Sequence, residues 1–162
     1  MSNDSTTQSV EITRTFDAPA SLVWDLWTRA DHFAAWYGPT GATVVVSDWN
    51  LSVGGRRLVS MTMETPNGSM EMWFVGEFVE IDAPHRLVYT ESVADADGNA
   101  TSAAEMGLPD DHPMETRVIV ELSEHDGRTT MNMTHEGVPA GSPGAMGWNM
   151  AIDALEARIA AA

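Results

Sequence analysis

The stretch SMEMWFVGEFVEIDAPHRLVYTES, residues 69–92, decides the fold because it holds two strand patterns on either side of one turn. Apolar side chains recur at alternate positions before Asp82 and again after His85. Such alternation is typical of strands whose two faces meet different surroundings. The segment Asp82–Pro84 between the runs is a turn signal. We therefore predict two antiparallel strands joined by a tight turn.

The same alternation extends outward on both sides of this pair. Upstream, TVVVSDW (43–49) and RRLVSMTMET (56–65) predict two strands; downstream, TRVIVEL (116–122) and TTMNMTHEG (129–137) predict two more. The last two are joined by a turn whose Asp126-Gly127 is a strong hairpin signal. Residues 93–115 are polar and rich in Gly, Pro and Asp, which predicts a long loop that is either mobile or functional.

Helical patterns flank these six strands. VEITRTF (10–16) predicts a first strand, and residues 17–39 predict two short helices capped by Asp17 and Asp31. The chain closes with a long helix that starts at Ser142-Pro143. Its apolar stripe has helical spacing and comprises Ala145, Trp148, Ile152, Leu155 and Ile159.

The order of elements predicts an α+β architecture. A strand, two short helices, six further antiparallel strands and a long helix would form one curved sheet with the last helix packed across it. One helix about 10 Å wide does not fill so broad a concave face, so we expect a cavity between sheet and helix. We predict a flexible N-terminus at residues 1–8 and a single domain over residues 9–162.

Charge excludes two classes of partner. The 24 acids face eight bases, all of them arginine, for a net charge of −16, which opposes binding to nucleic acid and to anionic membranes. The acidic, lysine-free composition indicates either a GC-rich genome or adaptation to high salt, and the sequence leaves both open.

The absence of cysteine fits a reducing compartment, and the polar start is unlike a signal peptide. No apolar run is long enough to span a membrane. We expect a cytoplasmic protein, either monomer or homodimer.

The ordered set of motifs resembles a known superfamily. The matching stretches are FDAPASLVWDLWTRADHFAAWYGP, DWNLSVGGRR, GEFVEIDAPHRLVYTES, the insert with EMGLPDD, GRTTMNMTHEGVPAG and GWNMAIDALEARIA. Together they span about residues 10–160 and resemble the START-like (SRPBCC, or Bet v 1-like) superfamily with its helix-grip fold. Within it, the chain resembles homologues of the activator of the heat-shock-protein-90 ATPase.

This resemblance implies several functions, because the superfamily includes lipid carriers, hormone receptors, polyketide cyclases and co-chaperones. We expect binding of a small hydrophobic, aromatic or polyketide-like molecule in the cavity. One alternative is a cyclase- or hydrolase-like enzyme in which Glu91 and His135 supply acid–base help. The other is a co-chaperone that contacts the heat-shock ATPase, although the further chaperone-binding domain of the eukaryotic activators has no counterpart here.

No motif in the sequence identifies catalytic or metal-binding residues. None of the five histidines pairs with another at metal-ligand spacing, and no phosphate-binding glycine loop is present; they are His32, His85, His112, His125 and His135. We therefore expect no metal and no cofactor, leave the catalytic residues unknown, and favour a binding protein over an enzyme. His135 is either a polar anchor for a ligand or a histidine bonded to a nearby backbone carbonyl. Glu91 faces either the cavity or solvent.

Eleven methionines are unusually many, and several recur two residues apart, as in Met61/Met63 and Met131/Met133. Strand alternation puts each pair on one face, where it either fills the core or forms an adaptable cavity wall. The expected ligand-binding residues combine these with aromatic and polar side chains: Trp36, Tyr37, Met61, Met63, Met72, Phe74, Tyr89, Glu91, Met131, Met133, His135, Trp148 and Ile152.

Overall fold

The computed structural model describes residues 9–37, 41–66, 68–95, 97–99, 115–137 and 143–161. Most of the insert at residues 93–115, the N-terminal residues 1–8 and the predicted helix start at Ser142 lie outside the described residues. The elements in chain order are β1 (Ser9–Phe16), α1 (Ala20–Thr28), α2 (Ala30–Trp36), β2 (Thr43–Trp49), β3 (Arg56–Thr65), β4 (Gly68–Asp82), β5 (Arg86–Ala94), β6 (Thr116–His125), β7 (Arg128–Glu136) and α3 (Pro143–Ala161).

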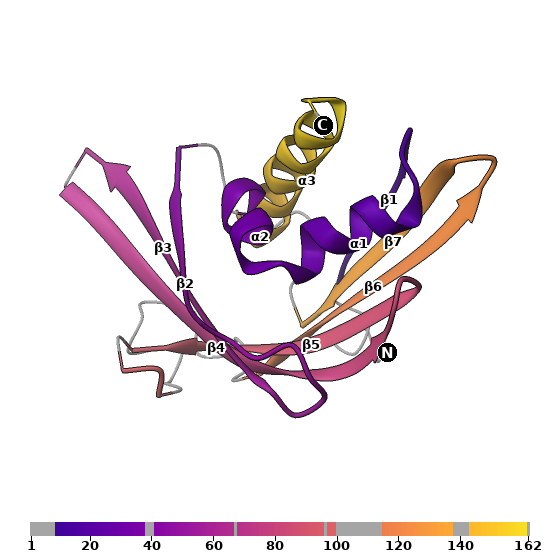
Figure 1. The fold of residues 1–162 in the computed structure, drawn as a ribbon. Helices are drawn as coiled ribbons and strands as arrows, with labels where there is room; N and C mark the ends of the chain where they lie inside the picture. Colours follow the sequence, from indigo (N-terminus) through magenta and orange to yellow (C-terminus); the bar gives the residue numbers. More distant parts are fainter. Residues whose placement is uncertain are drawn as a thin grey trace, which may run out of the picture.

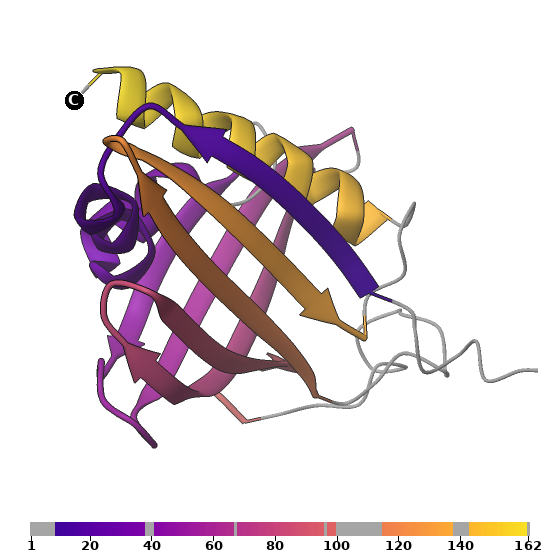
Figure 2. The same ribbon diagram turned by 90° about the vertical axis from the view of Figure 1, so that its right-hand side faces the viewer.

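One antiparallel sheet with strand order β1-β7-β6-β5-β4-β3-β2 forms the body of the fold. The sheet is strongly curved, and the three helices lie on its concave side (Figure 1). In the turned view, α3 runs beside β1 along one margin of the sheet (Figure 2). The first strand of the chain, β1, pairs with the last one, β7, along its whole length from Ser9 to Phe16. The predicted α+β helix-grip fold is confirmed.

The predicted turns also form. The β6–β7 hairpin closes through Asp126 and Gly127, whose φ angles are 55° and 78°. Positive φ at both central residues is what the tightest hairpin turns require. His125 and Arg128 pair on either side of that turn. The β4–β5 pair closes through residues 83–85, as the sequence predicts.

The predicted helix caps are wrong. Helix α1 begins at Ala20 after Pro19, and α2 begins at Ala30 after Arg29, with no side-chain cap at either N-terminus. The backbone N–H of Ala20 instead donates to Glu124 at 2.8 Å, so a residue of the distant β6–β7 hairpin satisfies it. The first N–H groups of a helix need acceptors from outside the helix. Tertiary structure thus supplies an acceptor that the local sequence was expected to supply.

Helix α3 buries the middle of the predicted stripe and is also tied to the sheet by charge. Trp148, Ile152 and Leu155 are buried in the core on the concave side. On its other side, the Arg14 guanidinium of β1 contacts Asp153 and Glu156 at 2.8 and 3.0 Å. These bonds raise the pKa of Arg14, chiefly through Asp153. Both acids are well exposed. The bridge therefore contributes at most about 1 kcal/mol.

Candidate ligand-binding site

The strand register brings the predicted site residues of the sheet onto one face. Directly paired residues of antiparallel strands point to the same side. The pairs Met61↔Met72, Val59↔Phe74, Val118↔His135 and Val120↔Met133 therefore share faces along the sheet. Val59, Val118 and Val120 belong to the core beneath the helices, so this face is the concave one. The predicted residues on it are Met61, Met63, Met72, Phe74, Tyr89, Glu91, Met131, Met133 and His135.

The helices bring the remaining four predicted residues to the same core. Trp36 and Tyr37 come from the end of α2, and Trp148 and Ile152 come from α3. The Tyr37 and Trp148 rings meet edge to face, with centroids 5.5 Å apart. Trp27 of α1 stacks on Trp148 at 5.9 Å, which adds it to this aromatic group.

Arg57 is a central residue of the site that the sequence analysis missed. It is fully buried on β3, and its guanidinium carbon lies 3.9 Å from the centre of the Tyr89 ring. Three further rings surround it, those of Phe33, Trp49 and Phe78, at 5.2 to 6.0 Å. The positive charge is thus held by the negative faces of four aromatic rings.

Glu91 of β5 supplies the opposite charge. Its Oε2 lies 3.6 Å from Nη1 of Arg57, and its side chain is 7% exposed, so the carboxylate faces inward. Within the described part of the chain, none of the three guanidinium nitrogens has a hydrogen-bond partner. Nor do two other buried donors, Trp27 Nε1 and the Tyr89 hydroxyl. Two of the residues with such donors, Arg57 and Tyr89, lie side by side on the concave face.

A glycine lies between Arg57 and Glu91 on the intervening strand, β4. Gly76 of β4 pairs with Arg57, and the flanking pairs Val75↔Ser92 and Phe78↔Tyr89 place it opposite Glu91 on the other side. A Cβ at Gly76 would collide with the backbone carbonyl of Thr90. The close approach of β4 to β5 thus requires glycine at the position between Arg57 and Glu91.

His135 belongs to a directed chain of buried hydrogen bonds. Trp148 Nε1 donates to His135 Nδ1 at 2.8 Å, and His135 Nε2 lies 2.8 Å from Oγ1 of Thr116. Thr116 in turn donates to the backbone oxygen of Glu91 at 3.0 Å. Because Nδ1 accepts, the neutral ring carries its proton on Nε2 and donates it to Thr116. These hydrogen bonds therefore link α3 to β7, β6 and β5.

Tyr37 completes the polar end of the site. Its hydroxyl donates to Oε2 of Glu91 at 3.3 Å, while its ring stacks on Phe33 with centroids 4.5 Å apart. Burial, reinforced by the Glu91 charge, raises the pKa of Tyr37 well above its ordinary value. Burial also raises the pKa of Tyr89, against the lowering effect of Arg57. Both phenols are therefore held in the neutral form.

The methionine end of the face is more open than the polar end. Met61 is buried, whereas Met63, Met72 and Phe74 are half-buried. These residues lie on the β3–β4 hairpin, which flares away from the helices on the left of Figure 1. Apolar surface thus continues from the enclosed core toward solvent along one face.

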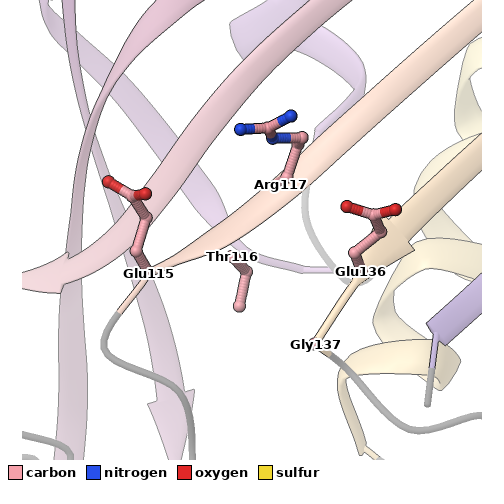
Figure 3. Close-up of a pocket in the computed structure, with 5 residues that line it drawn as sticks. All are labelled: Glu115, Thr116, Arg117, Glu136 and Gly137. Atoms are coloured by element: carbon pink, nitrogen blue, oxygen red, sulfur yellow. The ribbon is translucent and has the colours of Figure 1, made fainter. Parts of the chain in front are cut away.

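A separate open pocket of about 310 Å³ lies where β6 begins and β7 ends. It is lined by Glu115, Thr116, Arg117, Glu136 and Gly137, none of which is a predicted site residue (Figure 3).

Across the described ranges, no three acids or histidines cluster as metal ligands would. No helix within those ranges is long and apolar enough to span a membrane.

Comparison with known proteins gives the family and the fold. The family model described as "Activator of Hsp90 ATPase homolog 1-like protein" matches residues 17–160. A protein from Arthrobacter aurescens is similar with 23% identity and a TM-score of 0.77, over 99% of this chain and 91% of that one. The AHSA1 protein from Silicibacter pomeroyi is similar with 17% identity and a TM-score of 0.70, over 94% and 97%.

A protein from Staphylococcus epidermidis is similar with 25% identity and a TM-score of 0.71, over 92% of this chain and 87% of that one. No curated protein matches the chain. The family match covers nearly all of the elements that build the concave face. The chain belongs to the family of Activator of Hsp90 ATPase homolog 1-like proteins.

Proposed function

We propose that the protein binds a small apolar molecule, aromatic or polyketide-like, between the concave face of the sheet and α3. The single observation that carries this proposal is that methionines of three strands and helix α3 lie on the same side of the sheet. Methionines from β3, β4 and β7 line one side of the sheet, and α3 lies across the same side with Trp148 and Ile152. An apolar surface with a few polar groups at one end is the usual composition of a ligand site.

Methionine suits this role because its unbranched side chain adapts to ligands of different shape. The residues Met63, Met72 and Phe74 are half-buried, so they can lose further apolar area to a ligand. Such burial is worth about 25 cal/mol per Å² before ordering costs. Trp148 and Tyr37 add aromatic rings where this face meets the helices.

The hydrogen bonds at His135 favour binding over the acid–base role considered for an enzyme. A general base needs a lone pair directed at the substrate. Here Nδ1 already accepts from Trp148, and the Nε2 proton is directed at Thr116. His135 thus supports the proposal as a residue that fixes α3 and Trp148 in place over the sheet.

A neutral environment-sensitive dye such as Nile red tests the proposal, since a net charge of −16 disfavours anionic dyes. We expect saturable fluorescence enhancement that aromatic or polyketide-like compounds reverse. Met72→Gln should weaken dye binding severalfold. The matched control Val45→Gln changes an exposed residue paired with Ser60 on the opposite face and should leave binding unchanged. Absence of a saturable site, or equal effects of both variants, would refute the proposal.

A further inference from the structure

The polar end of the site already holds an aromatic hydroxyl, that of Tyr37. Its ring packs on Phe33 and against Trp148, and its hydroxyl points at the Glu91 carboxylate. Tyr37 is half-buried and lies at the end of α2, whereas Arg57 beside Glu91 is fully buried. The Tyr37 phenol thus occupies the position that the hydroxyl-bearing ring of a ligand would take beside Glu91.

The charge of the pair selects against ionic ligands. Arg57 and Glu91 balance each other at 3.6 Å. An anion placed here would meet the Glu91 carboxylate, and a cation would meet the guanidinium, each in a desolvated setting where repulsion is strong. The buried pair therefore gives no net advantage to either sign of charge.

The hydrogen-bonding capacity of the pair fits a hydroxyl group. Glu91 accepts from Tyr37 at 3.3 Å. This bond is longer than is typical of a hydroxyl that donates to a carboxylate. The guanidinium N–H groups have no acceptor within the described ranges. A hydroxyl can donate to Glu91 and accept from Arg57 at the same time, which an ether, a protonated amine or a hydrocarbon cannot do.

We propose that Arg57 and Glu91 form a subsite for a neutral hydroxyl on an aromatic or enolic ring, which takes the position of the Tyr37 hydroxyl. This inference rests on the proposed apolar site, and it names the polar group that a ligand presents at one end. In this proposal a ligand approaches from the side of Tyr37, which is bonded to Glu91 and is half-buried.

Three probes with the same ring test the subsite: 2-naphthol, naphthalene and 2-naphthoate, with affinities measured by tryptophan fluorescence and calorimetry at neutral pH. Because a hydrogen bond to a charged group contributes strongly, we expect 2-naphthol to bind about tenfold more tightly than naphthalene. The carboxylate should bind more weakly than either.

Two variants assign the preference to this pair. Glu91→Gln should reduce the advantage of naphthol over naphthalene to about twofold or less. Glu11→Gln, an exposed carboxyl on β1, is the matched control and should leave the advantage intact. Tyr37→Phe removes the competing hydroxyl and should increase the advantage, which keeps the test decisive if Glu91→Gln fails to fold.

The outcomes separate this inference from the proposed function. Equal binding of naphthol and naphthalene would overturn the hydroxyl subsite and leave the apolar site standing. Tightest binding of 2-naphthoate would replace it with an anion subsite and so overturn it. An unchanged or smaller naphthol advantage in Tyr37→Phe would also overturn it. If no probe binds at all, the proposed function itself fails.

Discussion

Both tyrosines of this chain lie beside the Arg57–Glu91 pair, so alkaline titration reports directly on the candidate site. The chain has two tyrosines, no cysteine and, since its eight basic residues are all arginine, no lysine. From about pH 9 to about pH 12, tyrosine is therefore the side chain that titrates. Burial raises the pKa of Tyr37 and of Tyr89 above their ordinary value.

The folded state holds the tyrosine protons more tightly than the unfolded state does, so raising the pH destabilises the fold. A tyrosine whose pKa is raised in the folded state stabilises the fold fully below its unfolded pKa of about 10, and this contribution is lost as pH rises above it. Each pH unit removes about 1.4 kcal/mol per tyrosine until the folded state also ionises. While both tyrosines stay protonated in the folded state, each pH unit above about 10 therefore removes about 3 kcal/mol, which is a large part of the whole stability of many domains.

The assay follows tyrosinate absorbance and far-ultraviolet circular dichroism together as pH rises. We expect no tyrosinate at the ordinary tyrosine midpoint near pH 10, and then a joint change in both signals as the protein unfolds at higher pH. In guanidinium chloride the same chain should titrate at about pH 10. Tyr37→Phe should halve the late signal and reduce the alkaline loss of stability. Tyrosinate with a midpoint near pH 10 in a protein whose circular dichroism is still native would refute the reasoning.

Three further predictions concern stability, each measured by urea or thermal unfolding. A Cβ at Gly76 meets the carbonyl of Thr90, whereas one at Gly147 in α3 meets open space. Gly76→Ala should therefore cost about 2–3 kcal/mol, while the control Gly147→Ala should be neutral or stabilising; equal effects would contradict this. Glu91→Leu should cost about 3–5 kcal/mol by leaving the Arg57 charge unpaired, and adding Arg57→Met should recover part of the loss; simple additivity would argue against a coupled pair. Added KCl should raise the melting temperature by screening a net charge of −16, and a flat or falling value would exclude adaptation to high salt.

Alternation alone predicted much of the concave face. Residues two apart on a strand share a side, so Met61 with Met63 and Met131 with Met133 could be placed together before any pairing was known. The apolar stripe of α3 likewise followed from helical spacing, and Trp148 and Ile152 are buried as predicted. Local periodicity is a property of neighbouring residues, which is why the sequence reveals it.

Periodicity could not predict which group accepts the hydrogen bond at the start of α1, nor that Arg57 is buried. Asp17 and Asp31 have the right chemistry for caps, but α1 takes its acceptor from Glu124 of a distant hairpin. Arg57 has the same strand parity as Val59 and Met61, which was a usable signal, yet an arginine in a strand near the sheet edge is expected in solvent. Its burial depends on an acid and aromatic rings that arrive from other elements.

By itself, then, the sequence determined the strands, the closing helix and the face of the sheet on which most of the predicted site residues lie. Only the folded chain decided that Arg57 and Glu91 meet over Gly76, with the Tyr37 hydroxyl beside them. The physical reason is that periodicity is local, whereas this meeting depends on the mutual register of three strands and on a close backbone approach that a single missing Cβ allows.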